Sequence, residues 1–153
     1  VIMSWSSGFE ELIQLDPAAR ENLIVGSNYY YTIDNPENKK FVEAYKKKFK
    51  GVPPGYAGAA GYGLMKMTLL GMQKSGSTEP QKVITALEEH KGKNFVGDFE
   101  IRGRNHQTVR PFFVLQTKKK NEMKNQYDMA EVVDVSSTEQ PKNINMCKDI
   151  GSF

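Results

Sequence analysis

Two helical patterns in direct succession constrain the fold of this chain more than any other feature of its sequence. Asn35-Pro36-Glu37 combines a good N-cap, a proline suited to the first helical position and an acidic side chain at the positive end of the dipole. Apolar residues then recur every three to four positions, at Phe41, Val42, Tyr45 and Phe49. Gly51 ends this amphipathic helix. After Pro53-Pro54-Gly55, a second helix is predicted from Tyr56 to Lys74.

Strand-like segments lie on both sides of these helices. Short apolar or alternating runs predict strands at residues 1–5, 23–31, 95–101, 112–115 and 129–135. A third helix is predicted from Ser77 or Thr78 to about Lys91, a helical turn or loop at 9–13, a polar loop at 118–125 and no regular structure from Ser136 on. Strands, then helices, then strands indicate a mixed α/β fold that is incomplete as a doubly wound domain.

Composition places the 153 residues with soluble globular proteins, at 39% hydrophobic and 25% charged, and the length suits one domain. The net charge of +3 is modest and both signs interleave, so no nucleic acid partner is indicated. No apolar run reaches the roughly 20 residues that cross a bilayer, so we expect no direct membrane insertion. The sequence opens in an apolar run without an initiator Met, which indicates that a preceding part, with any signal peptide, is missing.

The sequence has few residues of the types that usually catalyse reactions or bind metal ions. Cys147 is the single cysteine, so it is either a buried thiol or half of a disulfide to an absent partner. His90 and His106 form neither a cluster with metal-ligand spacing nor an evident acid–base pair. The lysine runs at 46–48 and 118–120 fit solvated surfaces. We therefore expect no catalytic residues, no metal and no cofactor.

The glycines of the second helix suggest a phosphate-binding loop, but their spacing excludes it. The dinucleotide fingerprint requires a third glycine where Lys66 stands, and the P-loop requires lysine where Leu64 follows Gly63. Two interpretations remain, and both can hold: a Gly/Ala face that lets another backbone approach, and a helix N-terminus that opens at Tyr56 toward a ligand.

Two further segments are candidates for a binding site. Trp5-Ser6-Ser7-Gly8 follows the carboxyl end of a predicted strand, where open α/β sheets bind ligands, and it offers hydroxyls and free backbone N–H groups. Tyr29-Tyr30-Tyr31 is either a set of ordinary strand aromatics or part of a binding wall.

The stretch NPENKKFVEAYKKKFKGVPPGYAGAAGYGLMKM, residues 35–67, resembles the second half of periplasmic solute-binding proteins of the branched-chain amino acid ABC transporter type. The turn at 75–77 and Glu79-Pro80 also match, and residues 95–102 and 105–116 are similar to the closing hairpin of that family. The resemblance covers residues 1 to about 135.

This resemblance implies the C-terminal portion of a type I periplasmic binding protein fold, in which two three-layer α/β/α lobes joined by a three-strand hinge close on a ligand. Residues 1–33 are then the end of the second lobe, and residues 32–34 include a hinge crossing. Residues 34–117 form the C-terminal part of the first lobe, and residues 118–153 the return to the second lobe and the tail. A missing N-terminal portion of the same protein would complete the first lobe.

The resemblance also implies site residues. The loop of residues 5–8 matches the one that holds the ligand's ammonium group, often through a carboxylate. Serines stand there, with Glu10 and Glu11 slightly later, which favours an aromatic or aliphatic carboxylate or an amide over an ordinary α-amino acid. The start of the second helix matches the segment that touches the ligand's side chain. The expected ligand-binding residues are Trp5, Ser6, Ser7, Gly8, Tyr31, Tyr56 and Ala57.

By the same resemblance, the function is that of a non-enzymatic solute receptor of an ABC importer, with a transporter permease as partner and a small amino acid-like or carboxylate ligand. Its location would be periplasmic or extracellular, as a lipoprotein if the organism is Gram-positive. Cys147 resembles a tail cysteine that, in some members, is placed to pair with the missing half. A ligand-sensing regulatory domain of the same fold is the alternative, and an α/β enzyme would require an acid–base pair.

Overall fold

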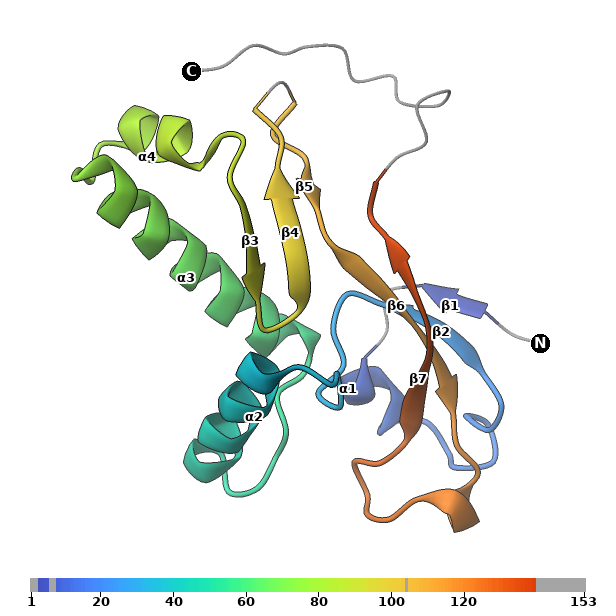
Figure 1. The fold of residues 1–153 in the computed structure, drawn as a ribbon. Coiled ribbons are helices and arrows are strands. Elements are labelled where there is room, and N and C mark those ends of the chain that lie inside the picture. The colour runs from blue at the N-terminus through green and yellow to red at the C-terminus, as the bar shows by residue number, and fades with distance from the viewer. Residues whose placement is uncertain (1–2, 6–7, 104, 140–153) are drawn as a thin grey trace.

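The computed structural model describes residues 3–5, 8–103 and 105–139 (Figure 1). Its helices are α1 (Phe9–Leu12), α2 (Pro36–Lys48), α3 (Tyr56–Ser75) and α4 (Pro80–Leu87), with one 3-10 turn, η1 (Lys120–Glu122). Its strands are β1 (Met3–Trp5), β2 (Ile24–Ser27), β3 (Lys91–Asn94), β4 (Gly97–Ile101), β5 (Thr108–Val109), β6 (Pro111–Thr117) and β7 (Ala130–Ser137). None of the helices in these ranges is long and apolar enough to span a membrane.

The larger sheet has the order β1-β2-β6-β7. β1 pairs with β2 in parallel, while β6 is antiparallel to both β2 and β7. Val25 of β2 lies opposite Leu115 of β6, and both side chains are fully buried because this part of the sheet faces the core. Residues 24–27 and 111–117 therefore share one sheet, although the sequence assigns them to different lobes.

The other half of the molecule is built from the smaller sheet, of order β3-β4-β5, with α3 and α4. In Figure 1, α3 runs alongside β3 and β4, and the larger sheet lies on the opposite side of this smaller sheet. Gly71 allows α3 and α4 to approach closely, since an added Cβ would lie 2.8 Å from Cγ1 of Val83.

Three places link the two halves. After β2 the chain leaves the larger sheet at Asn28, and it enters that sheet again at Arg110. Beyond β7, Thr138 and Glu139 accept hydrogen bonds from Gln107 and Arg102 of the other half. Arg110 joins all three places. Its guanidinium nitrogens donate to the carbonyl and side-chain oxygens of Asn28, at 3.0 and 2.9 Å, and its backbone N–H donates to the hydroxyl of Thr138 at 2.9 Å.

One buried cluster connects the halves. The ring of Phe95, from the turn between β3 and β4, lies 5.8 Å from that of Tyr29 and 5.2 Å from that of Phe41 on α2. Aromatic pairs at these separations add to the free energy of burial. The same cluster includes Val25 and Leu115 of the larger sheet, so side-chain packing holds the two halves together.

The helix pair predicted from the sequence is confirmed. The side chain of Asn35 accepts hydrogen bonds from the backbone N–H groups of Glu37 and Asn38, as an N-cap should. α3 ends one residue later than predicted, because Gly76 adopts the left-handed conformation, with φ of 63°, that closes a helix.

The prediction of a strand running through Tyr29-Tyr30-Tyr31 is wrong, because β2 ends at Ser27. The hydroxyl of Ser27 donates to the carbonyl of Tyr29 at 2.8 Å, and the buried amide of Asn38 donates to the carbonyls of Tyr31 and Ile33. Side chains therefore satisfy these backbone groups in place of a neighbouring strand.

The region after α3 also differs from prediction. Glu79, not Ser77 or Thr78, is the N-cap of α4, and the helix ends at Leu87, so that the residues from Lys91 form β3. The predicted strand at 95–101 shortens to β4, because the side-chain oxygen of Asn94 accepts from the N–H groups of Val96 and Gly97 and turns the chain into a hairpin. β7 continues to Ser137, and the polar segment at 118–125 contains η1.

Candidate functional site

Gly8 and Tyr56, two of the expected ligand-binding residues, come together although 48 positions separate them in the sequence. Gly8 is the N-cap of α1 and Tyr56 is the first residue of α3. A Cβ added to Gly8 would lie 3.1 Å from Cδ1 of Tyr56. Trp5 ends β1, while Ser6 and Ser7 fall outside the described residues. The junction of α1 and α3 is therefore the part of the expected site that can be described.

The expected free N–H group at Gly8 is already in use. It donates a hydrogen bond of 2.7 Å to Oε2 of Glu11, which lies three residues further along α1. Arg20 holds the other end of α1, since its Nη1 donates to the carbonyl of Leu12 at 2.9 Å. The short helix is thus fixed at both ends, and the N–H of Gly8 already has a partner within it.

Glu10, which the sequence alone did not place in the site, reaches from α1 to the start of α3. A Cβ added to Gly55 would overlap Oε1 of Glu10, and a Cβ added to Gly8 would lie 2.7 Å from Oε2. The two glycines leave the space that this carboxylate fills. The Oε2 atom is buried and finds no hydrogen-bond partner in the part of the chain that the structure describes.

The environment of Glu10 disfavours its charge. Burial is the largest effect and raises the pKa of the Glu10 carboxyl. Hydrogen bonds from the backbone N–H groups of Glu10 and Tyr56 lower this pKa, and the negative charge of Glu11 raises it. The result is a half-buried acid at the N-terminus of α3 with one oxygen left to accept a hydrogen bond.

Tyr31 belongs to the core on the other side of α1. Its hydroxyl donates to the carbonyl of Tyr127 at 2.9 Å, and its ring meets that of Phe9 edge to face at 6.3 Å. Burial, and then the charge of Asp128, raises the pKa of Tyr31 to about 12. The hydroxyl therefore has an internal partner, and the ring also contacts the ring of Tyr30 and Nζ of Lys46.

Tyr56 also lines a cavity of about 300 Å³ between α3, the smaller sheet and the chain crossings. Its polar lining comes from Asn28, Asn94, Thr108 and Arg110, and most of the other lining residues are apolar. Ala57, the neighbour of Tyr56 in the expected site, is exposed. No local sequence signal marks Asn28 or Arg110, because they are brought together only by the pairing of β2 with β6.

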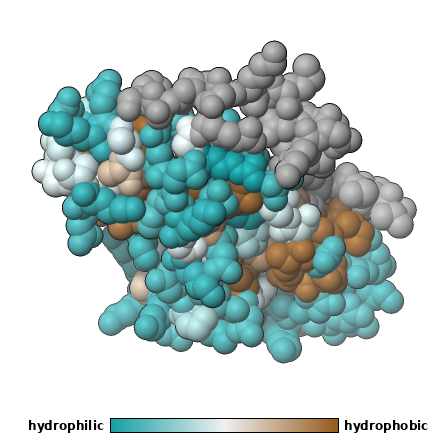
Figure 2. Space-filling model, turned by 45° about the horizontal axis from the view of Figure 1, so that its top comes forward, coloured by the Kyte–Doolittle hydropathy of each residue, from teal (hydrophilic) through white to brown (hydrophobic). Residues whose placement is uncertain are grey.

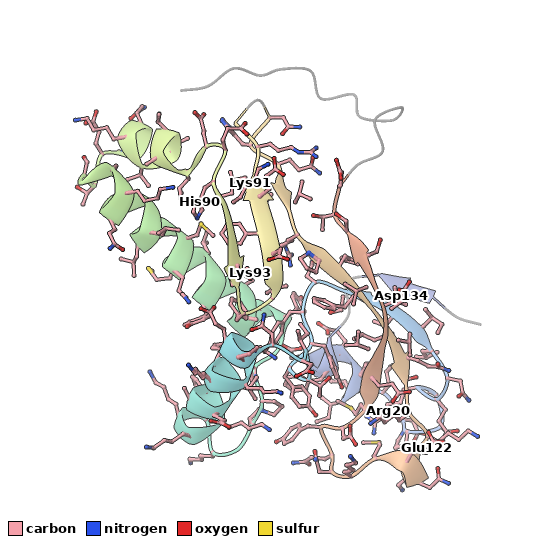
Figure 3. The ribbon with its side chains drawn as sticks, in the orientation of Figure 1. Arg20, His90, Lys91, Lys93, Glu122 and Asp134 are labelled. Atoms are coloured by element: carbon pink, nitrogen blue, oxygen red, sulfur yellow. The ribbon has the colours of Figure 1, made fainter. Side chains whose placement is uncertain are left out.

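The two histidines have other partners. Nδ1 of His90 lies 3.0 Å from Nζ of Lys74, and Nε2 of His106 lies 3.0 Å from Oε1 of Glu88. Figure 3 shows His90 with Lys91 and Lys93 along β3, on the opposite side of the molecule from Arg20. No group of three or more His, Cys, Asp or Glu side chains within the described ranges could hold a metal ion.

Comparison with known protein families identifies the family of this chain. Residues 1–122 match the family profile described as periplasmic binding protein. The chain belongs to the periplasmic binding protein family. None of the curated proteins compared with the sequence matches it.

Solved structures of this family share the fold. An amino acid ABC transporter substrate-binding protein from Pseudomonas fluorescens Pf-5 is 26% identical, with a TM-score of 0.84 over 94% of this chain. A leucine binding protein from Thermotoga maritima MSB8 is 24% identical, with a TM-score of 0.66, and the match covers 86% of this chain and 37% of that one. A solute binding protein of an ABC transporter from Rhodopseudomonas palustris BisB5, in complex with 3,4-dihydroxy benzoic acid, is 20% identical, with a TM-score of 0.68 over 82% of this chain and 33% of that one.

These matches confirm the predicted α/β fold of the type I periplasmic binding proteins and the resemblance to amino acid ABC transporter substrate-binding proteins. The chain spans 38% of the length of the Pseudomonas fluorescens protein. The sequence thus corresponds to a part of the two-lobed fold.

Proposed function

We propose that this chain is the C-terminal portion of an extracytoplasmic solute receptor of an ABC importer, which binds a small amino acid-like or carboxylate ligand between two lobes without chemical turnover. The observation that carries this proposal is the junction of Gly8, Glu10 and Tyr56. There, the start of α1 in one half meets the start of α3 in the other half, with a polar group that lacks a partner among the described residues. Small-molecule sites rely on a few such well-placed polar groups.

The names of the similar structures support the ligand class. One is a leucine binding protein and another was solved with 3,4-dihydroxy benzoic acid. Each compound has one carboxylate: leucine joins it to an aliphatic side chain and an ammonium group, and 3,4-dihydroxybenzoic acid to an aromatic ring with two hydroxyls. Tyr56 offers a flat apolar surface to such a side chain or ring, while Oε2 of Glu10 offers an acceptor to an N–H or O–H group of the ligand.

The strand pairing favours a revised division into lobes. Because β6 pairs with β2 along residues 24–27, we place the boundary at Arg110 instead of residue 117. In this division α2, α3, α4 and the smaller sheet belong to the first lobe, and the larger sheet with α1 belongs to the second. The three crossings at Asn28, Arg110 and Thr138 form the hinge.

The surface of α3 supports the proposal that a preceding part of the protein completes the first lobe. In Figure 2 the largest hydrophobic patch lies on the right, the side of the larger sheet, on a face that is otherwise mostly hydrophilic. A separate group of exposed apolar side chains belongs to α3. On α3, Leu64, Met65 and Leu69 are 71%, 60% and 56% exposed. Apolar side chains exposed together on one helix mark a surface that another element covers.

A thermal-shift screen of the full-length receptor against amino acids and aromatic or aliphatic carboxylates tests the function. A ligand that binds only the folded state stabilises it by mass action, by about 2.7 kcal/mol at a ligand concentration of 100 times the Kd. This gain raises the midpoint temperature of unfolding. Stabilisation by none of these compounds would contradict the proposal. Co-purification with a permease supports import, whereas co-purification with a signalling protein favours the alternative, a ligand-sensing regulatory domain of the same fold.

A further inference from the structure

Arg110 carries a positive charge that the described residues leave unneutralised. No ion pair among the described residues includes it. A guanidinium has five N–H donors. Two of them bind the carbonyl and side-chain oxygens of Asn28, which are neutral, and the described residues provide no acceptor for the others. Because a half-buried cation without a negative partner is costly to desolvate, this position favours an anion.

The space beside Arg110 continues along α3 as a groove. Arg110 lines the cavity of about 300 Å³ next to Tyr56, and a second cavity of about 350 Å³ lies further along the helix, up to Gln73. The two cavities share the lining residues Gly63, Met67, Asn94 and Phe95, so they form one groove between α3 and the hairpin of β3 and β4, the α3 groove. From Tyr56 to Gln73 it follows about 25 Å of helix, which is long for a small solute and suits a segment of polypeptide.

In the proposed division into lobes, the α3 groove lies within the first lobe and not between the two lobes. Its walls are α3, the smaller sheet and the chain around Asn28 and Arg110. Leu64 lines the first cavity and Leu69 the second, and both belong to the exposed apolar surface of α3. Since this is the surface that the preceding part of the protein covers in our proposal, the groove faces that part and not the solute.

The charged side chains along the α3 groove have one sign. Arg110 lines the first cavity, and Lys66 and Lys93 line the second, whereas no described Asp or Glu lines either. Lys66 and Lys93 have counter-charges outside the groove, in Glu37 and Asp98. Arg110 has none among the described residues. The groove is therefore complementary to an apolar segment that carries a carboxylate.

We propose that the preceding part of the protein lays an apolar segment into the α3 groove and presents an Asp or Glu carboxylate to Arg110. The free N–H groups of the guanidinium bind this carboxylate in a charge-assisted, bidentate hydrogen bond. The inference rests on the proposed function, in which that part completes the first lobe, and adds the chemistry of the contact. Since Arg110 also bonds to Asn28 and Thr138, the ion pair ties the places that link the two halves to the rest of the first lobe.

Zero-length cross-linking of the full-length protein tests this contact. Arg110→Lys keeps the positive charge and places an amine in the groove, which a water-soluble carbodiimide joins to a carboxylate that touches it. After proteolysis, mass spectrometry should find position 110 joined to an Asp or Glu of the preceding part. Arg102→Lys is the matched control, because Arg102 is paired with Glu139 and the variant should become joined to Glu139. The contact is refuted if the control gives its cross-link while position 110 gives none, or gives one to an acid of this chain.

Arg110→Gln provides a second measurement, which needs no cross-link. It leaves the carboxylate of the preceding part buried without a partner, so we expect the ratio of folded to unfolded protein to fall about tenfold or more at pH 7, measured by urea unfolding. Protonation of that carboxylate removes the unpaired charge, so the difference from the unchanged protein should narrow toward pH 4. A difference that stays constant from pH 7 to pH 4 would show that no carboxylate meets Arg110.

Solute binding separates this inference from the receptor function. If neither measurement finds the carboxylate but a solute of the thermal-shift screen stabilises the full-length protein, the contact falls and the receptor function stands. If no solute stabilises the protein while the cross-link forms, the contact stands and the receptor function falls.

Discussion

The hydroxyl of Tyr29 donates a hydrogen bond of 2.8 Å to the side-chain oxygen of Asn38, and both residues are buried. The amide nitrogen of Asn38 donates in turn to the carbonyls of Tyr31 and Ile33. One side chain on α2 therefore satisfies three polar groups of the first crossing. It replaces the strand neighbour that an extended tyrosine segment would need.

We expect Asn38→Ala to destabilise the protein by about 3 kcal/mol or more, because each buried polar group that loses its partner costs about 1 to 3 kcal/mol. Urea unfolding followed by circular dichroism measures this loss. Glu43→Ala, on the exposed side of the same helix, is the control and should stay within about 0.5 kcal/mol of the unchanged protein. Equal stability of the two variants would show that the network around Asn38 is dispensable.

Two glycines of α3 should respond to alanine in opposite ways. Gly71→Ala places a Cβ 2.8 Å from Cγ1 of Val83 and 3.0 Å from Cδ1 of Leu87, so we expect a loss of about 1 to 3 kcal/mol from overpacking. At Gly61 no atom lies within 4 Å of an added Cβ, so alanine should gain about 0.5 to 1 kcal/mol from helix propensity. Thermal unfolding of both variants tests the pair, and a destabilised Gly61→Ala would contradict the arrangement around α3.

Glu10 should make stability depend on pH in a predictable direction. Its pKa in the folded protein is raised above the ordinary value of 4.5. The folded state therefore keeps the proton over a window just above that value where the unfolded chain has released it, and stability falls as pH rises through this window. Glu10→Gln removes the cost of ionising this carboxyl in the folded state. The stability of the variant relative to the unchanged protein should therefore increase from about pH 4 to about pH 7. A relative stability that stays constant or falls across this range would show that Glu10 is not desolvated at α3.

Tyr56 is the residue whose loss should affect ligand binding without unfolding the protein. It is only half-buried and packs at the edge of the core, so the Tyr56→Ala receptor should retain its circular dichroism spectrum. Loss of the ring removes an apolar contact with the ligand, and we expect affinity to fall about tenfold or more in a calorimetric titration. Unchanged affinity would remove Tyr56 from the site.

Local signals in the sequence were enough for α2 and α3, but not for the bounds of α4 or for the site. Asn35 and Gly76 act on their own helices, so capping rules predict α2 and α3 closely. The end of β2 depends on Asn38, eleven residues beyond Ser27, and no strand pattern contains that information. Glu10 and Arg110 need partners from distant segments, at Gly55 and Asn28, which become neighbours only after the sheet and the crossings have formed.

The central claim is that the protein is a receptor for one small solute, and calorimetric titration of the full-length protein with the most stabilising compound of the thermal-shift screen tests it most directly. The account predicts saturable binding of one ligand per protein, weakened by Tyr56→Ala. Absence of saturable heat with every amino acid and carboxylate tested would contradict it.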